Sequence, residues 1–155
     1  MNYWLAKSEP EAYSIDDLKQ DGVTSWGGVR NFKARNTLRA MAVGDRVLVY
    51  ASNANPSGVT GVAEVTTAAY PDPLQFKKGN EYYDASSRPE KPKWSAVDLT
   101  FVERFPAVVS LESLKGTRAL ATMDVVQPGR RPSVQPVSAE HFAVVVKMGR
   151  SGKTG

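Results

Sequence analysis

The stretch AVGDRVLVYASNANPSGVTGVAEVTTAAY, residues 42–70, contains two apolar, β-branched runs on either side of a loop with a proline and a glycine. The first run follows a Gly-Asp turn at residues 44–45, and the second begins at Gly58. Runs of this composition, separated by turn residues, are typical of neighbouring antiparallel strands. The stretch therefore predicts a β-hairpin.

The rest of the chain predicts further strands and several short helices. Residues 2–7, NYWLAK, are apolar on both alternating faces, which indicates a central strand, and residues 94–105 alternate as another strand. Ser14 and Asp17 resemble a capping box before a helix. The predicted helices are residues 15–20, 31–41, 110–116, 119–126 and 138–149. Because strands and helices do not alternate regularly, we expect an α+β fold, a compact barrel or curved sheet with helices at its ends.

Length and composition bound the function. The 155 residues fit one domain, with a net charge of +4 and no apolar run long enough for a membrane span. There is no cysteine and one histidine, His141, which excludes a disulfide framework, a zinc-thiolate cluster and a two-histidine metal site. We expect no metal and no cofactor. The first residues do not resemble a signal peptide, so we expect a cytoplasmic protein, and residues 149–155, GRSGKTG, predict a flexible tail.

The segment WGGVRNFKARNTLR, residues 26–39, concentrates four basic residues. On a helix over residues 31–41, Ala34, Leu38 and Met41 form an apolar stripe, and Asn31, Arg35 and Arg39 form the stripe beside it. Guanidinium groups suit phosphates, and an amide can read a base edge. The alternative is a solvated basic face in which Arg35 and Arg39 pair with nearby acids.

Seven motifs in order resemble the EVE domain family. They are YWLAKSEP at 3–10, WGGVRNFKARNTLR at 26–39, GDRVLVYASN at 44–53, GVAEV at 61–65, YPD at 70–72, YYD at 82–84 and SVQPVS at 133–138. The resemblance implies a single EVE domain over residues 1–148 with a PUA-like fold, a small mixed β-barrel flanked by short helices. The family is related to YTH domains, which hold a methylated adenine of RNA in an aromatic cage. The resemblance thus implies a monomeric, non-catalytic module that reads modified bases in DNA or RNA.

The residues and the resemblance together give a candidate site. The predicted base-binding residues are Trp4, Lys7, Ser8, Glu9, Trp26, Val29, Arg30, Asn31, Ser52 and Asn53, and the predicted phosphate-binding residues are Arg35, Arg39 and Arg130. Trp26, beside two glycines, is the favoured stacking surface for an extruded base. Trp4 fits the core at least as well, and Ser52 and Asn53 fit a turn cap as well as a pocket.

The sequence departs from the family pattern at three places. Ala51 stands where the family commonly has a histidine, and Gly27 stands where it usually has an aspartate. Arg131 and Pro132 add a basic-proline step before the last motif. The changes at Gly27 and at Arg131 and Pro132 make the neighbourhood less acidic, which favours a phosphate. At Ala51, either the contact is dispensable or the ligand differs.

Two other functions remain as alternatives. An enzyme acting on a modified nucleotide could use carboxylates such as Glu9, Asp72 or Asp84, but no serine has a histidine partner at a recognisable spacing, and phosphate-cradling loops are absent. A protein-docking domain could use exposed aromatic side chains at Phe76, Tyr82 and Tyr83.

Overall fold

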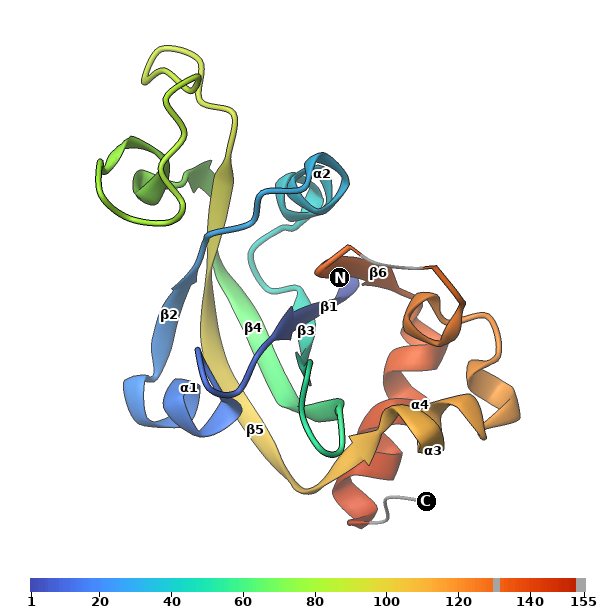
Figure 1. Ribbon diagram of the computed structural model, residues 1–155. Coiled ribbons are helices and arrows are strands. Elements are labelled where there is room, and N and C mark those ends of the chain that lie inside the picture. Colours follow the sequence, from blue (N-terminus) through green and yellow to red (C-terminus); the bar gives the residue numbers. More distant parts are fainter. Residues whose placement is uncertain (130–131, 153–155) are drawn as a thin grey trace.

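The structure, a computed structural model, describes residues 1–129 and 132–152, and its centre is one six-stranded mixed sheet. The strands are β1 (Tyr3–Ser8), β2 (Val23–Trp26), β3 (Arg46–Ala51), β4 (Gly58–Pro71), β5 (Ser95–Ser110) and β6 (Val134–Val137). Their order across the sheet is β2-β5-β4-β3-β1-β6, and β1 and β3 are the parallel pair (Figure 1). The described helices are α1 (Ile15–Asp21), α2 (Phe32–Ala40), α3 (Leu111–Lys115) and α4 (Ala139–Ser151), with 3-10 turns η1 (Pro73–Phe76), η2 (Arg118–Leu120) and η3 (Asp124–Val126).

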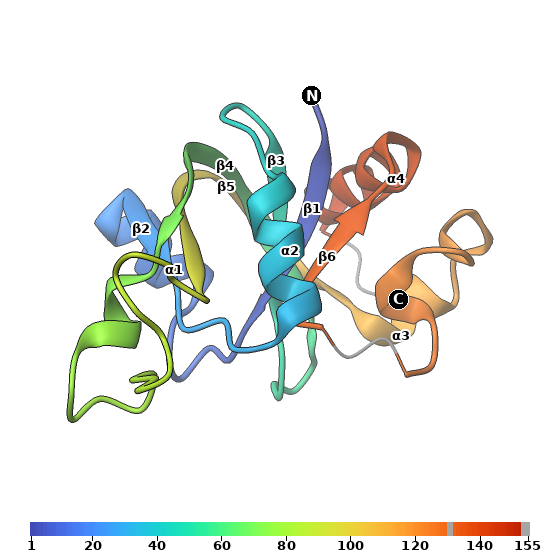
Figure 2. The ribbon, with the colours of Figure 1, turned by 90° about the horizontal axis from the view of Figure 1, so that it is seen from above.

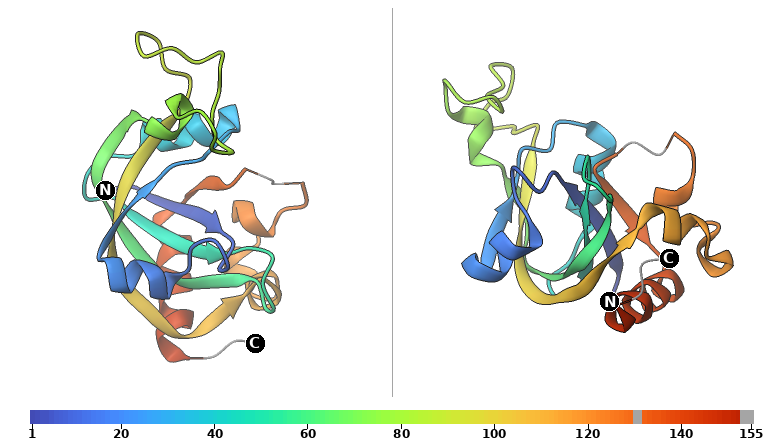
Figure 3. Two further views of the ribbon diagram at one scale, coloured as in Figure 1. Left: turned by 60° about the vertical axis from the view of Figure 1, so that its left-hand side comes forward. Right: turned by 60° about the horizontal axis from the view of Figure 1, so that its bottom comes forward.

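The predicted hairpin is confirmed as β3 and β4, and it continues into the longer pair β4 and β5. The register between β4 and β5 shifts at four places, and such bulges bend a sheet. A glycine at position 61 lets the strands approach, because a Cβ there would overlap the carbonyl oxygen of Glu103. The sheet curls strongly as a result (Figure 3).

The α+β class is confirmed, but the closed barrel is not. In the described part of the chain, the edge strands β2 and β6 each pair with one neighbour, so the sheet remains open. Helix α2 contacts β4, β5 and β6 and lies over the concave face (Figure 2). The edge strands β2 and β6 have only four residues each, and α2 lies over the gap between them.

Each face of the sheet carries a hydrophobic core. Trp4 and Ala6 of β1 belong to the core on the side of α1 and α2, whereas Leu5 belongs to the core on the side of α3 and α4. The two-sided pattern predicted for β1 is therefore confirmed. The capping box is also confirmed, since the Asp17 amide donates to Ser14 Oγ at 3.1 Å and the Ser14 amide donates to Asp17 Oδ2 at 2.9 Å.

Several predicted boundaries differ from the structure. Residues 119–126 form two 3-10 turns instead of one helix. Helix α2 begins at Phe32, and α4 continues to Ser151, so it includes the first three residues of the predicted tail. No helix in residues 1–129 and 132–152 is long and apolar enough to cross a membrane.

The contact between α4 and β5 gives a test of the packing. A Cβ at Gly149 would overlap the buried ring of Phe105, so Gly149→Ala should destabilise the fold by about 1–3 kcal/mol despite alanine's higher helix propensity. The melting temperature should fall by roughly 2–10 °C. Gly116→Ala is the control, because its nearest contact would be an ordinary 3.4 Å to the Glu112 carbonyl. Equal melting temperatures for the two variants would contradict this packing.

Candidate nucleic-acid-binding site

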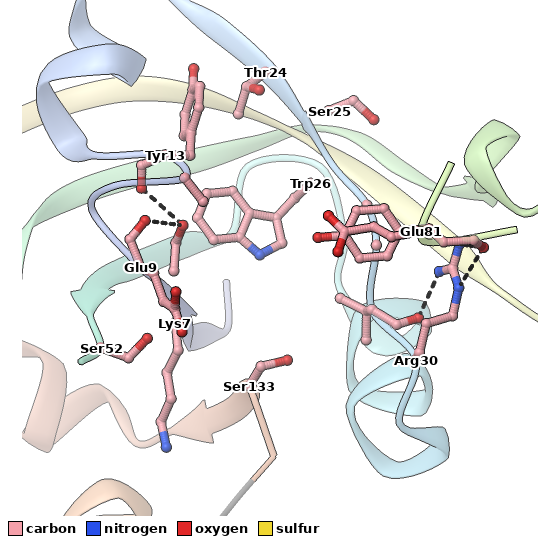
Figure 4. A pocket seen from close by; sticks show the side chains of 16 residues that line it. Lys7, Glu9, Tyr13, Thr24, Ser25, Trp26, Arg30, Ser52, Glu81 and Ser133 are labelled. Carbon is pink, nitrogen blue, oxygen red and sulfur yellow. Dashed lines mark hydrogen bonds between the residues drawn. The ribbon is translucent and has the colours of Figure 1, made fainter. Parts of the chain in front are cut away.

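An open pocket of about 980 Å³ lies where β1 and β2 end. It is lined by Lys7, Ser8, Glu9, Ala12, Tyr13, Thr24, Ser25, Trp26, Gly27, Gly28, Val29, Arg30, Ser52, Glu81, Tyr82 and Ser133 (Figure 4). Seven of the predicted base-binding residues are among them: Lys7, Ser8, Glu9, Trp26, Val29, Arg30 and Ser52. The volume is at the upper end of the range of about 300–1,000 Å³ that is usual for ligand pockets.

Trp26 forms a wall of this pocket and also belongs to the core. Its side chain is 8% exposed, and Tyr13 packs edge-on against it with ring centroids 6.4 Å apart. Among the described residues, the indole N–H of Trp26 has no hydrogen-bond partner, yet it is not enclosed. In Figure 4 this nitrogen points toward the open space between Lys7 and Ser133. An indole N–H is only a donor, so the pocket offers one to a ligand.

Asp72 holds the segment after Trp26 in place. This carboxylate is 1% exposed and accepts hydrogen bonds from the amide of Gly28 at 2.8 Å, the Nη1 of Arg30 at 2.9 Å and the amide of Leu74 at 2.9 Å. Gly28 has φ +75°, and a Cβ there would lie 2.9 Å from the ring of Tyr82. The glycine therefore allows both the turn and the close approach of the tyrosine that lines the pocket.

Arg30 joins the two sides of the pocket wall. Besides its ion pair with Asp72, its guanidinium donates to the carbonyl oxygen of Tyr82 through Nε at 3.2 Å and Nη2 at 2.8 Å. It also lies over the rings of Tyr82 and Trp94, 5.5 and 5.4 Å from their centroids. Most donors of Arg30 are thus used within the protein, and its charge is balanced by Asp72.

The loop that follows β4 is held together by the side chains of Gln75 and Trp94. Gln75 is fully buried, and its amide donates to the carbonyls of Asp72 at 2.7 Å and Trp94 at 2.8 Å. The Trp94 indole donates to Asp84 Oδ2 at 2.7 Å. Hydrogen bonds from Ser86, then from the Trp94 indole, lower the pKa of Asp84 to about 2. Residues 72–94, which we call the pocket loop, are therefore joined at their two ends by Gln75.

Arg35 and Arg39 contact the end of the pocket loop. Arg35 Nη1 donates to the Lys93 carbonyl at 3.1 Å, and Arg39 Nε donates to Ser95 Oγ at 2.9 Å. The Arg39 Nη2 also donates to the carbonyls of Pro92 and Lys93. These donors, predicted to contact phosphates, are directed at backbone carbonyls, the Ser95 hydroxyl and the side-chain oxygen of Asn36. Among the described residues, neither arginine forms the ion pair with an acid that the alternative predicts. Arg130, the third predicted phosphate ligand, lies outside the described residues.

The other side of the pocket carries a cation and hydroxyl groups. The Lys7 ammonium lies 5.8 Å from the centroid of the Tyr50 ring, and burial lowers the pKa of Lys7. Ser8 Oγ donates to the Tyr13 carbonyl at 2.8 Å, while the Ser52 amide donates to the Ser8 carbonyl at 3.0 Å. These bonds fix the ends of β1 and β3 against each other.

Three of the predicted base-binding residues lie away from the pocket. Trp4 is buried, and its indole donates to Asp45 Oδ2 at 2.9 Å. Burial raises the pKa of Asp45, but hydrogen bonds from the Asn2 and Ala42 amides and from Trp4 outweigh it, and the net pKa is lowered. Asn31 is exposed and caps α2 by accepting from the Ala34 amide at 3.0 Å. Asn53 is also exposed, with φ +50°, and donates to Glu9 Oε1 at 2.7 Å.

The residues that sequence reasoning missed come mostly from loops. Tyr13, Glu81, Tyr82 and Ser133 line the pocket. Tyr82 and Ser133 lie in two of the quoted motifs, YYD and SVQPVS, which is the one signal that could have identified them. In the described part of the chain, no group of three or more His, Cys, Asp or Glu side chains could hold a metal ion.

The hydrogen-bonded carboxylate of Asp84 in the pocket loop gives a pH-dependent prediction. The pKa of Asp84 in the folded protein is below its ordinary value of 3.8, so the stability it contributes is full above about pH 4 and is lost as the pH falls toward about 2. Asp84→Asn should lower the melting temperature at neutral pH, and the difference from wild type should shrink between about pH 4 and about pH 2. Thermal melts across this range measure it.

Glu90→Gln, at an exposed position of the same loop, is the matched control and should show no such convergence. A difference between Asp84→Asn and wild type that stays constant with pH would contradict the assignment.

Comparison with known proteins places the chain in one family. Residues 2–148 match the family model of the EVE domain. Mouse thymocyte nuclear protein 1 is 39% identical over 165 residues, which cover 95% of this chain and 73% of the relative.

Two solved structures are similar over nearly the whole length. The human THYN1 protein in complex with 5-methylcytosine-containing DNA is 38% identical, with a TM-score of 0.90 over 96% of this chain and 98% of that chain. A Leishmania major protein is 46% identical, with a TM-score of 0.93 over 97% and 96%. The expectation of a cytoplasmic location is contradicted, because the mouse and human relatives, which match over most of the chain, are named as nuclear proteins. The chain belongs to the EVE domain family.

Proposed function

We propose that this chain binds DNA that carries a modified base and holds that base in the pocket beside Trp26, without catalysing a reaction. The similarity to the human THYN1 protein, whose structure is in complex with 5-methylcytosine-containing DNA, supports the ligand class. The observation that carries the proposal is the unpaired indole N–H of Trp26 inside an open pocket.

The chemistry of the pocket fits a base. Trp26, Tyr13 and Tyr82 provide aromatic surface, and stacking of a base on such a surface contributes about 1–3 kcal/mol. The indole of Trp26 can donate to a ring nitrogen or carbonyl of the base, and hydroxyls of Ser8, Ser52 and Ser133 line the remaining side. Extruding a base from a duplex costs a few kcal/mol, which stacking and these hydrogen bonds can offset.

The carboxylates considered for catalysis already have protein partners. Asp72 is paired with Arg30, Asp84 accepts from Trp94, and Glu9 accepts from Asn53. His141 lies on α4, and its ring contacts Thr122 at 3.3 Å, so it is not beside the pocket serines. This arrangement favours binding over acid–base or nucleophilic catalysis.

The docking alternative has less support. Phe76, Tyr82 and Tyr83 are each partly buried, and Tyr82 packs on Gly28 inside the pocket wall. They therefore do not form the exposed aromatic surface that docking of a protein requires.

Trp26→Phe tests the proposal, since it keeps an aromatic ring in the core and removes the N–H. Alanine at this position would also remove core packing, at a cost of about 3–5 kcal/mol. Binding is measured to two duplexes that are identical except for one 5-methylcytosine. Wild type should prefer the modified duplex. Trp26→Phe should weaken binding to the modified duplex about 2- to 12-fold, the loss expected for one hydrogen bond, and should change binding to the unmodified duplex, whose bases stay stacked, much less.

Trp4→Phe is the matched control, because it removes an indole from the same core at a position away from the pocket. Its preference for the modified duplex should equal that of wild type once folding is confirmed. A wild-type protein without any preference would contradict the proposed function. Equal losses in the two variants would contradict the role of Trp26.

A further inference from the structure

The pocket loop carries an exposed basic turn a few residues before Tyr82, which lines the pocket. The loop projects from the body of the molecule (Figure 3), and Lys77 and Lys78 are exposed at a turn that Gly79 completes with φ +91°. Within the described residues, neither ammonium group has an ion pair or hydrogen bond. Both charges are therefore available to a partner.

This basic turn is fixed to the pocket wall by one side chain. The Asn80 amide donates to the Leu74 carbonyl at 2.9 Å and to the Lys77 carbonyl at 2.7 Å. Its Oδ1 accepts from the Tyr82 amide at 2.7 Å. Because Tyr82 lines the pocket, Asn80 connects the backbone of the basic turn to the pocket wall.

The arginines of α2 have a different arrangement. Arg35 and Arg39 direct their donors at Pro92, Lys93 and Ser95, where the pocket loop returns to β5. The Arg35 guanidinium also lies 4.8 Å from the centroid of the Phe32 ring, which stacks on Trp94. These contacts indicate that the two arginines anchor the loop, because several of their guanidinium donors are used in hydrogen bonds within the protein.

From these contacts we infer that Lys77 and Lys78 bind the phosphates that flank the base in the pocket, and that Arg35 and Arg39 position the loop that carries them. The inference rests on the proposed function and adds the path of the nucleic-acid backbone. Lysine is a compact, hydrated point charge that suits a phosphate contact of this kind. Neutralising a phosphate releases counterions, so each contact contributes about 0.9 to the dependence of log K on log salt concentration in duplex DNA.

Lys77→Ala/Lys78→Ala tests the inference in the full chain. Affinities for the 5-methylcytosine duplex and its unmodified counterpart are measured from low to high salt. The salt slope should fall by about two units for both duplexes, because phosphate contacts are independent of the base. The ratio of the two affinities should stay at the wild-type value.

Lys115→Ala/Lys147→Ala is the control, with the same change in net charge at exposed positions on α3 and α4, away from the pocket. Its slope should match wild type. An unchanged slope in Lys77→Ala/Lys78→Ala, or an equal fall in the control, would overturn the inference. The ratio of the affinities for the two duplexes reports on the pocket separately. A ratio of one for wild type would contradict the proposed function, while the salt slope would still report on the contacts of Lys77 and Lys78.

Discussion

The buried carboxylate of Asp72 connects the parts of the molecule on which the candidate site depends. It accepts from Gly28 and Arg30 on one side and from Leu74 on the other, and so joins the segment after β2 to the pocket loop. Removing one partner of a buried ion pair leaves an uncompensated charge and costs about 3–5 kcal/mol. Without Asp72, Arg30 would lose its counter-charge, and the packing of Tyr82 on Gly28 would lose its support.

Gly27 lies directly beside this carboxylate. A Cβ there would lie 3.1 Å from the carboxylate atoms of Asp72, closer than most side chains allow. The aspartate usual in the family at this position would bring a second carboxylate near Asp72, with Arg30 as the nearest cation. Gly27 has no side chain and therefore leaves the ion pair of Asp72 and Arg30 undisturbed.

The sequence predicts those parts of the fold that have a local physical pattern. The β3–β4 hairpin, the two-sided strand β1 and the Ser14 capping box each have their cause within a few residues, and each is confirmed. Strands β2 and β6 were missed because four residues at a sheet edge carry too little alternation to predict a strand.

Parts of the site could not be predicted because their residues carry no local pattern or have partners far away in the sequence. Asn31 was assigned to a base edge, but its position before α2 makes it a helix cap. Tyr13 and Tyr82 lie in loops without periodicity, and the carbonyl groups that Arg35 and Arg39 contact lie more than 50 residues away along the chain. Only the tertiary structure brings such groups together.

The central claim, that a modified base enters the pocket beside Trp26, can be measured most directly on the indole N–H groups. The chain has three tryptophans, and their indole resonances can be followed by ¹H–¹⁵N NMR during titration with a 5-methylcytosine duplex. The unpaired N–H of Trp26 should shift as the base binds, whereas that of Trp4, bonded to Asp45 in the core, should stay in place. A bound complex in which the Trp26 resonance does not move would contradict the account.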